Sequence, residues 1–207
     1  EPQFLKNDEN GYLINPDTND IYWYHGMGPD NAQTATGIYD KKLSNTLYLT
    51  SSEDIAYSIV NNNMLDFGGD YAVFKVTVKL PAKKLFDVRH ALSDSEYRQV
   101  AMELFQKYES EFVENYFSQA LITGLLNYEK YDFYFNEKMA NNLLKKGFVG
   151  WVEVEAPYRI YGYGKEPLTL AILQDTELEQ YIRVVDMVEV KEEFGDLILV
   201  NKDFTLT

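Results

Sequence analysis

The sequence predicts a single α+β domain. Three observations support this: the length of 207 residues suits one domain, no repeat or linker divides the chain, and the expected elements run strand, helix, strand, helices and then several strands. Because strands and helices do not alternate regularly, a parallel doubly wound fold is excluded. The hydrophobic content of 45% indicates a globular protein rather than a disordered one.

The first half of the chain predicts a lead-in, three strands and a helix. Residues 1–20 are polar and rich in turn residues, which indicates an irregular lead-in. Runs of aromatic and β-branched residues predict strands at 21–25, 47–49 and 71–80. Thr50 and Glu53 have the spacing of a capping box, in which Thr50 caps a helix that continues to about residue 61.

The second half predicts a helical segment followed by four strands. A second capping box, from Ser93 to Glu96, opens the helical segment, and Gly147 suits the left-handed end of its last helix, expected at 136–146. Residues 93–146 are therefore expected to form a helical insertion. Strands are predicted at 148–154, 166–173, 181–190 and 196–201, with a loop rich in Gly and Tyr at 157–165.

Charge and composition exclude several classes of function. Lys and Arg number 19 against 33 Asp and Glu, so the net charge is −14, which argues against broad nucleic-acid binding. The absence of cysteine excludes disulfides, Cys-ligated zinc and a thiol nucleophile, and two histidines are too few for a multi-histidine metal cage. No apolar run reaches the roughly 18 residues of a membrane-spanning helix. The amino end is unlike a signal peptide, and the composition fits a cytoplasmic or a secreted protein.

Three features carry residue types that are suited to chemistry. His25 ends the first predicted strand, Tyr48 and Tyr57 flank the first capping box, and Glu166 opens a late strand after the loop at 157–165. Site residues often lie at such element boundaries. Each feature alone also has an ordinary explanation, as a satisfied histidine, a core tyrosine or a solvated carboxylate. Their order along the chain is more specific than any one of them.

The motifs around these residues are Tyr24-His25-Gly26, then Leu47-Tyr48-Leu49-Thr50 with Ile55-Ala56-Tyr57, then Phe148-Val149-Gly150-Trp151 followed by Glu166-Pro167-Leu168. In this order they resemble the His-Tyr-Glu branch of the ADP-ribosyltransferase superfamily, which includes diphtheria-toxin-like toxins and poly-ADP-ribose polymerases. The resemblance implies a split β-sheet core and a mono-ADP-ribosyltransferase, a toxin or effector type of enzyme. Such an enzyme cleaves the nicotinamide–ribose bond of NAD, its co-substrate, without a metal.

The resemblance also implies a role for each residue. Glu166 would be the catalytic carboxylate, acting with His25 and Tyr48. Tyr48 and Tyr57 would clamp the nicotinamide, and Tyr24, His25 and Gly26 would anchor NAD. Residues 28–46 would form a donor loop, and the loop at 157–165 would meet a macromolecular acceptor, for which a protein is favoured over nucleic acid.

Departures from the pattern and competing assignments remain. Met27 replaces the small hydroxyl residue expected after His-Gly, and a proline directly follows Glu166. The Arg-Ser-Glu branch is disfavoured because no arginine precedes Arg89. Glu153 and Glu155 have the paired spacing of that branch and compete weakly for the catalytic position.

Three alternative functions stay open at the level of sequence. The first is an NAD glycohydrolase, in which water accepts the ADP-ribose. The second is an enzyme like a glycosidase that pairs Glu153 with Glu166. The third is a non-catalytic module that binds glycans or peptides on an exposed aromatic platform of Tyr22, Trp23, Tyr24, Tyr158, Tyr161 and Tyr163.

Overall fold

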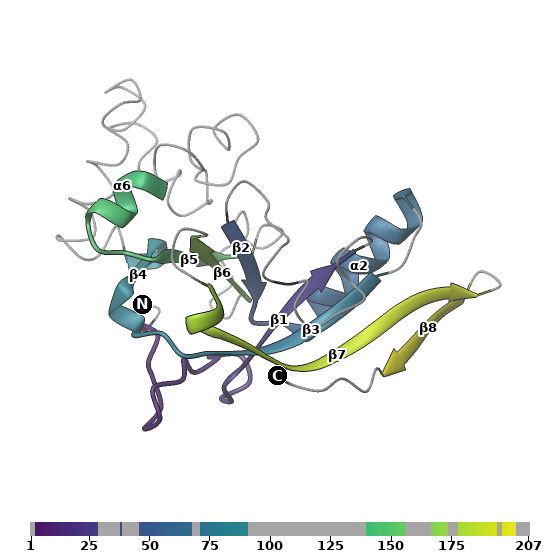
Figure 1. The fold of residues 1–207 in the computed structure, drawn as a ribbon, viewed down its shortest axis with the longest axis horizontal. Helices are drawn as coiled ribbons and strands as arrows, with labels where there is room; N and C mark the ends of the chain where they lie inside the picture. Colours follow the sequence, from purple (N-terminus) through teal and green to yellow (C-terminus); the bar gives the residue numbers. More distant parts are fainter. Residues whose placement is uncertain are drawn as a thin grey trace, which may run out of the picture.

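The computed structural model describes residues 3–28, 38, 46–67, 71–90, 140–155, 167–173, 178–193 and 196–201. In these residues eight strands form one sheet in the order β4-β5-β6-β2-β1-β3-β7-β8 (Figure 1). Neighbouring strands are antiparallel except β4 and β5, which run parallel. The mixed sheet with its few described helices confirms the predicted α+β class.

The strands lie where the sequence predicts them, with one addition. The first four are β1 (Tyr22–Met27), β2 (Thr46–Thr50), β3 (Tyr71–Val78) and β4 (Leu85–Asp87). The last four are β5 (Gly150–Val154), β6 (Leu168–Leu173), β7 (Ile182–Glu193) and β8 (Asp196–Asn201). The sequence pattern misses β4, because a three-residue strand is too short to show alternation and forms only by pairing with β5.

Helix α2 (Glu53–Phe67) follows β2 and is longer than predicted. The predicted cap is wrong by two residues. Ser52 Oγ accepts the Ile55 N–H at 3.3 Å, so Ser52 caps the helix. Thr50 is still part of β2, paired with Thr169, and its hydroxyl accepts the Ser52 N–H instead, at 3.2 Å.

Helix α6 (Ala140–Lys145) ends as predicted at Gly147, which has a φ of +88°. The Gly147 N–H donates to Leu144 O and the Phe148 N–H donates to Leu143 O, both at 3.0 Å, which is the Schellman arrangement. The rest of the predicted insertion, residues 93–139, lies outside the described residues. The short 3-10 turns are η1 (Ala82–Lys84), η2 (Val88–His90) and η7 (Leu178–Gln180).

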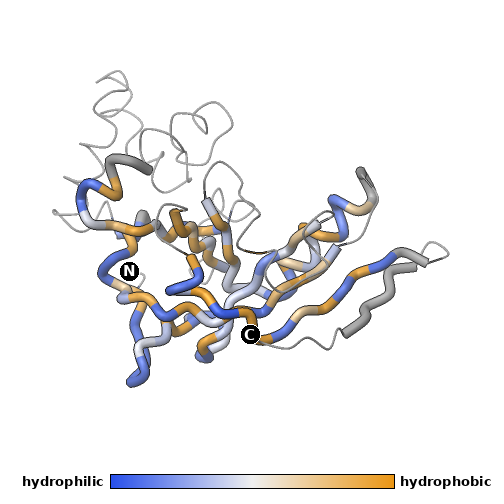
Figure 2. Tube along the Cα trace, viewed as in Figure 1, coloured by the Kyte–Doolittle hydropathy of each residue, from blue (hydrophilic) through white to orange (hydrophobic). Residues whose placement is uncertain are grey.

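One apolar core joins strands from both ends of the sheet. It includes Trp23 and Phe74 from β1 and β3 together with Leu49 and Leu170 from β2 and β6. Hydrophobic residues recur along these strands, whereas the lead-in is mostly hydrophilic (Figure 2). Helix α2 covers the opposite face, where it contacts β1 and β3. Burying such large side chains contributes about 1.5–3 kcal/mol each, so this core is the main source of stability.

The lead-in is irregular, as predicted, but is firmly attached to the sheet. Leu5 and Leu13 are part of the apolar core. Asn15 is fully buried, and its Nδ2 donates to Tyr22 O at 2.7 Å and to Ser51 O at 2.8 Å. This asparagine therefore ties the start of β1 to the end of β2, the two strands that border the candidate site.

Candidate functional site

The sheet is almost divided between β1 and β2. β1 pairs with β3 along six residues and β2 pairs with β6 along five, but β1 and β2 pair at one position only, Tyr24 with Thr50. Around His25 and Tyr48 the two strands therefore face each other without a ladder. We call β4, β5, β6 and β2 the β2 half, and β1, β3, β7 and β8 the β1 half.

His25 bridges the two halves at this split. Its Nδ1 lies 2.5 Å from the backbone oxygen of Tyr48. Because a carbonyl oxygen only accepts hydrogen bonds, Nδ1 must donate, and Nε2 is then the acceptor nitrogen of the neutral ring. The imidazole is half-buried. The side chain of the histidine in the first motif thus contacts the backbone of the tyrosine in the second, while the ring of that tyrosine points to the face of the sheet on which α2 packs.

The ring of Tyr48 is held by Trp151 of β5. Both residues are cross-strand partners of Ala171, which lies between them on β6. Cross-strand partners point to the same face, and the small side chain of Ala171 leaves room for the two rings to meet. Their centroids are 6.1 Å apart at an angle of 79°, an edge-to-face contact. Trp151 is fully buried and Tyr48 is half-buried, so Trp151 supports a ring that stays partly accessible.

A row of polar side chains crosses the sheet beside this ring pair. From β5 to β7 the register joins Glu153, Thr169, Thr50, Tyr24, Lys75 and Asp186. As cross-strand partners they share the face on which α2 packs. The row runs from Glu153, which is 1% exposed, to the exposed Asp186. A carboxylate so deeply buried on an otherwise apolar strand is desolvated, and its burial leaves little surface for contact with a substrate.

Tyr24 and Tyr57 lie in the β1 half, packed in one cluster with Val60 of α2. Burial, followed by the charges of Glu53 and then Asp20, raises the pKa of Tyr24 to about 12. Burial and then Glu53 also raise the pKa of Tyr57. Among the described residues, no ring contact joins Tyr57 to Tyr48. The two proposed clamp tyrosines therefore rest on different halves of the sheet.

Gly26 has a packing role that its motif does not reveal. A β-carbon at this position would lie 2.8 Å from Val60 Cγ2 and 2.9 Å from the backbone oxygen of Ala56. Both atoms belong to α2, so the glycine allows the helix to approach β1 closely. Helix packing alone thus accounts for this glycine, and its predicted contact with NAD is a separate proposal.

Glu166 lies outside the described residues, as do the loop at 157–165 and positions 29–37 and 39–45 of the predicted donor loop. The residue after it is described. Pro167 O accepts the Glu155 N–H at 2.8 Å, which joins the ends of β5 and β6. The unexpected proline therefore precedes β6 and leaves its ladder intact.

Sequence reasoning missed Trp151 and the two threonines Thr50 and Thr169 as neighbours of the site. The register of β2, β6 and β5 brings these residues together, and a local sequence pattern does not contain that register. Glu153 was named from the sequence as a weak competitor for the catalytic position, and the structure places it in the polar row beside Thr169.

Within the described ranges, no group of three His, Asp or Glu side chains is placed to hold a metal ion. No helix in those same ranges is long and apolar enough to cross a membrane. Comparison of this chain with protein-family models, with curated proteins and with solved structures gives no match.

Proposed function

We propose that this chain is a mono-ADP-ribosyltransferase that cleaves the nicotinamide–ribose bond of NAD and transfers ADP-ribose to an acceptor. The observation that carries the proposal is the contact between His25 and Tyr48. The resemblance rests on separate motifs, one at 24–26 and one at 47–57, and it implies that both serve one site. That the two motifs meet at 2.5 Å, across strands that are otherwise unpaired there, supports this reading.

The division of the sheet supports the finer assignment of the fold. The resemblance implies a split β-sheet, and one residue pair is all that joins β1 to β2 in the register. We therefore propose an ADP-ribosyltransferase-like split sheet, with NAD bound where the halves separate. The half-buried imidazole and the half-buried ring of Tyr48 lie at this place.

The chemistry of NAD cleavage fits these residue types. Loss of nicotinamide builds positive charge on the ribose, which a carboxylate stabilises by charge and by a hydrogen bond to a ribose hydroxyl. We assign this role to Glu166. Tyr48 would stack on the nicotinamide with Tyr57 on its other side, while Nε2 of His25 would accept a hydrogen bond from a ribose hydroxyl. The backbone of Gly26 would complete the anchor, and the buried ring of Tyr24 would support this strand from the side of α2 without touching NAD.

The acceptor and the competing functions follow from the same site. A protein acceptor is proposed because the net charge of −14 disfavours nucleic acid. Hydrolysis of NAD is the near relative of this reaction, with water as the acceptor. The aromatic binding platform loses support, because Trp23 and Tyr24 are buried and have no surface to offer a glycan or peptide.

The test is to incubate the chain with NAD and follow nicotinamide release by chromatography. The proposal expects steady release that depends on the protein. Labelled NAD added to a cell lysate then separates the two reactions, since transfer labels proteins and hydrolysis yields free ADP-ribose. If no nicotinamide is released, with or without lysate, both the transferase and the glycohydrolase proposals are refuted.

A further inference from the structure

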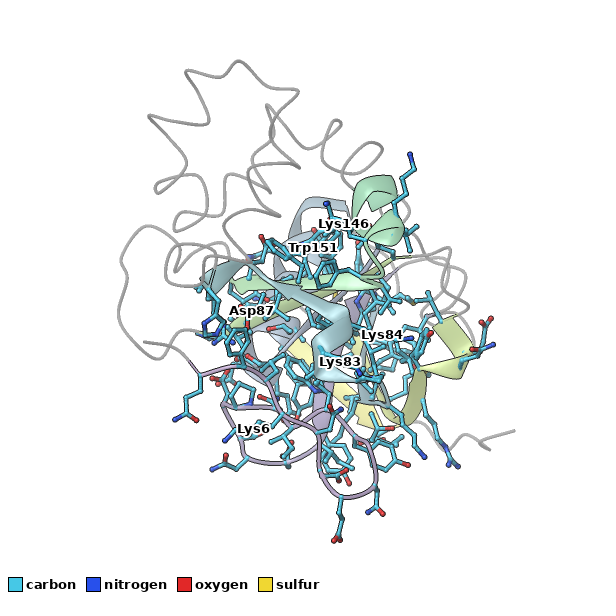
Figure 3. All side chains as sticks on the ribbon, turned by 90° about the vertical axis from the view of Figure 1, so that its left-hand side faces the viewer. Lys6, Lys83, Lys84, Asp87, Lys146 and Trp151 are labelled. Atoms are coloured by element: carbon cyan, nitrogen blue, oxygen red, sulfur yellow. The ribbon has the colours of Figure 1, made fainter. Side chains whose placement is uncertain are left out.

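We propose that the end of the molecule formed by β4, η1 and α6 is a docking surface for an acidic polypeptide segment. Five lysines gather there, and we call them the basic end: Lys6, Lys83, Lys84, Lys145 and Lys146. Figure 3 looks onto this end and shows Lys6, Lys83, Lys84 and Lys146 on the side that faces the viewer. The inference does not depend on the proposed reaction with NAD.

Hydrogen bonds between distant segments build the basic end. The side chain of Asn7 donates to Leu80 O at 2.7 Å and accepts the Ala82 N–H at 2.9 Å. These two bonds seat Lys6 of the lead-in beside η1. The Val149 N–H donates to Lys84 O at 2.9 Å, which joins η1 to the chain that leaves α6. The lysines are therefore assembled by the fold rather than by one basic run in the sequence.

The charge of this end is opposite to that of the whole chain. Residues 3–7, 80–90 and 140–152 contain six Lys and Arg and one acid, Asp87, a local charge of +5. Since the chain carries −14, the remaining residues sum to −19. Asp87 is buried and engaged by Arg89, whose Nε and Nη2 donate to its two oxygens at 2.9 and 2.7 Å. Within these three segments, no exposed carboxylate offsets the lysines.

The lysines are accessible. Lys6, Lys83, Lys84 and Lys145 are exposed, and the ion pairs found in the described part of the chain involve none of them. A lysine ammonium is a point charge on a flexible stem, which suits carboxylates spaced irregularly along a peptide. Bidentate recognition would instead require arginine, and Arg89, the arginine that the described segments place at this end, is committed to Asp87.

The net charge of the rest of the chain distinguishes two possible anionic partners, an acidic polypeptide and a nucleic acid. Screening limits charge interactions to about 8–10 Å at physiological salt, so a short acidic segment on the basic end is influenced mainly by the lysines. A nucleic acid carries a charge on every nucleotide and is longer than a surface of five lysines. Its phosphates would therefore also approach the remaining residues of the chain, whose net charge is −19. The size and isolation of the basic end thus favour an acidic polypeptide.

The experiment measures fluorescence anisotropy of a labelled decaglutamate peptide titrated with the full chain at about 50 mM salt. We expect saturable binding that weakens at higher salt. The double variant Lys83→Glu/Lys84→Glu should weaken it about fivefold or more, because two attractions become repulsions. The variant Lys6→Glu/Lys145→Glu should act in the same direction and serves if the first variant fails to fold, which circular dichroism checks.

The matched control is Arg183→Glu/Lys191→Glu, which changes the net charge equally at two β7 positions outside the basic end. It should weaken binding less than about twofold. Absence of peptide binding, or an equal loss in the control, would overturn the proposal. If an oligothymidylate of ten nucleotides binds more tightly than the peptide, the proposal is also overturned, in favour of a nucleic-acid partner. None of these outcomes depends on NAD turnover.

Discussion

The two halves of the sheet use tyrosine in different ways. Beside the β1 half, Tyr24 of β1 and Tyr57 of α2 pack in one cluster near Glu53, and burial raises the pKa of both phenols. In the β2 half, Tyr48 meets Trp151 edge to face, and its backbone oxygen accepts a hydrogen bond from Nδ1 of His25. The β1 half uses its rings to hold a helix, whereas the β2 half presents a supported ring at the split.

This difference shows that position relative to the split, more than residue type, decides whether a tyrosine ring is buried under α2 or stays partly accessible. Tyr24 and Tyr48 both occupy strands that border the split. Tyr24 lies under α2 because Gly26 lets the helix approach β1. Tyr48 lies at the boundary because Ala171 and Trp151 hold its ring from the other side. The following predictions test this division, beginning with the largest effect.

The carboxylates give the largest expected effect. Glu166→Gln keeps the shape of the side chain and removes its charge, so we expect nicotinamide release to fall by about 10²–10⁴-fold. Glu153→Gln is the matched control in the β2 half. Because Glu153 is 1% exposed and has little surface to offer a substrate, this variant should keep activity within about tenfold. The reverse ranking would move the catalytic role to Glu153.

The tyrosines come next. Tyr48→Ala removes the ring at the split and should raise the KM for NAD by about 5–30-fold, the worth of one good stacking contact. Tyr57→Ala should lower the midpoint of thermal unfolding as well, because Tyr57 belongs to α2 and packs against the buried cluster that includes Tyr24 of β1. Steady-state kinetics and thermal scans of both variants check this. A Tyr57→Ala variant that loses only activity would contradict the packing role of the β1 half.

Gly26 tests how the helix is seated. Gly26→Ala places a methyl group within 3 Å of Val60 and Ala56, so we expect a loss of about 1–3 kcal/mol in the free energy of unfolding. Gly147→Ala has open space and suffers only from its φ of +88°, which should cost about 1 kcal/mol. Urea unfolding compares them. If the Gly26 variant proves as stable as the native chain, the close approach of α2 is not needed.

The last expected effect, which develops only above pH 10, is a dependence of stability on alkaline pH. The pKa of Tyr24 is raised to about 12, whereas an unfolded tyrosine titrates near 10. Between these values the unfolded chain loses a proton that the folded chain keeps, so stability present below pH 10 is lost as pH rises, by up to about 2 kcal/mol. Urea unfolding at pH 9 and 11.5 should show this loss, and Tyr24→Phe should reduce it. A loss of the same size in the Tyr24→Phe variant would contradict the assignment to Tyr24.

Local patterns sufficed for the strands that carry apolar alternation, and for the end of α6 at Gly147. They failed where tertiary pairing decides: β4 exists through β5, and Ser52 caps α2 because β2 continues through Thr50. For the site, the resemblance placed His25 with Tyr48. It did not reveal Trp151 or the polar row, because these depend on register across strands that are far apart in the sequence.

The central claim is that His25 and Tyr48 belong to an NAD-binding site at the split between β1 and β2. The most direct measurement is nicotinamide release by the native chain and by His25→Ala, with thermal unfolding of both as a control for folding. We expect the native chain to release nicotinamide and the folded variant to be slower by about 10²-fold or more. Equal rates from the two proteins would contradict the claim.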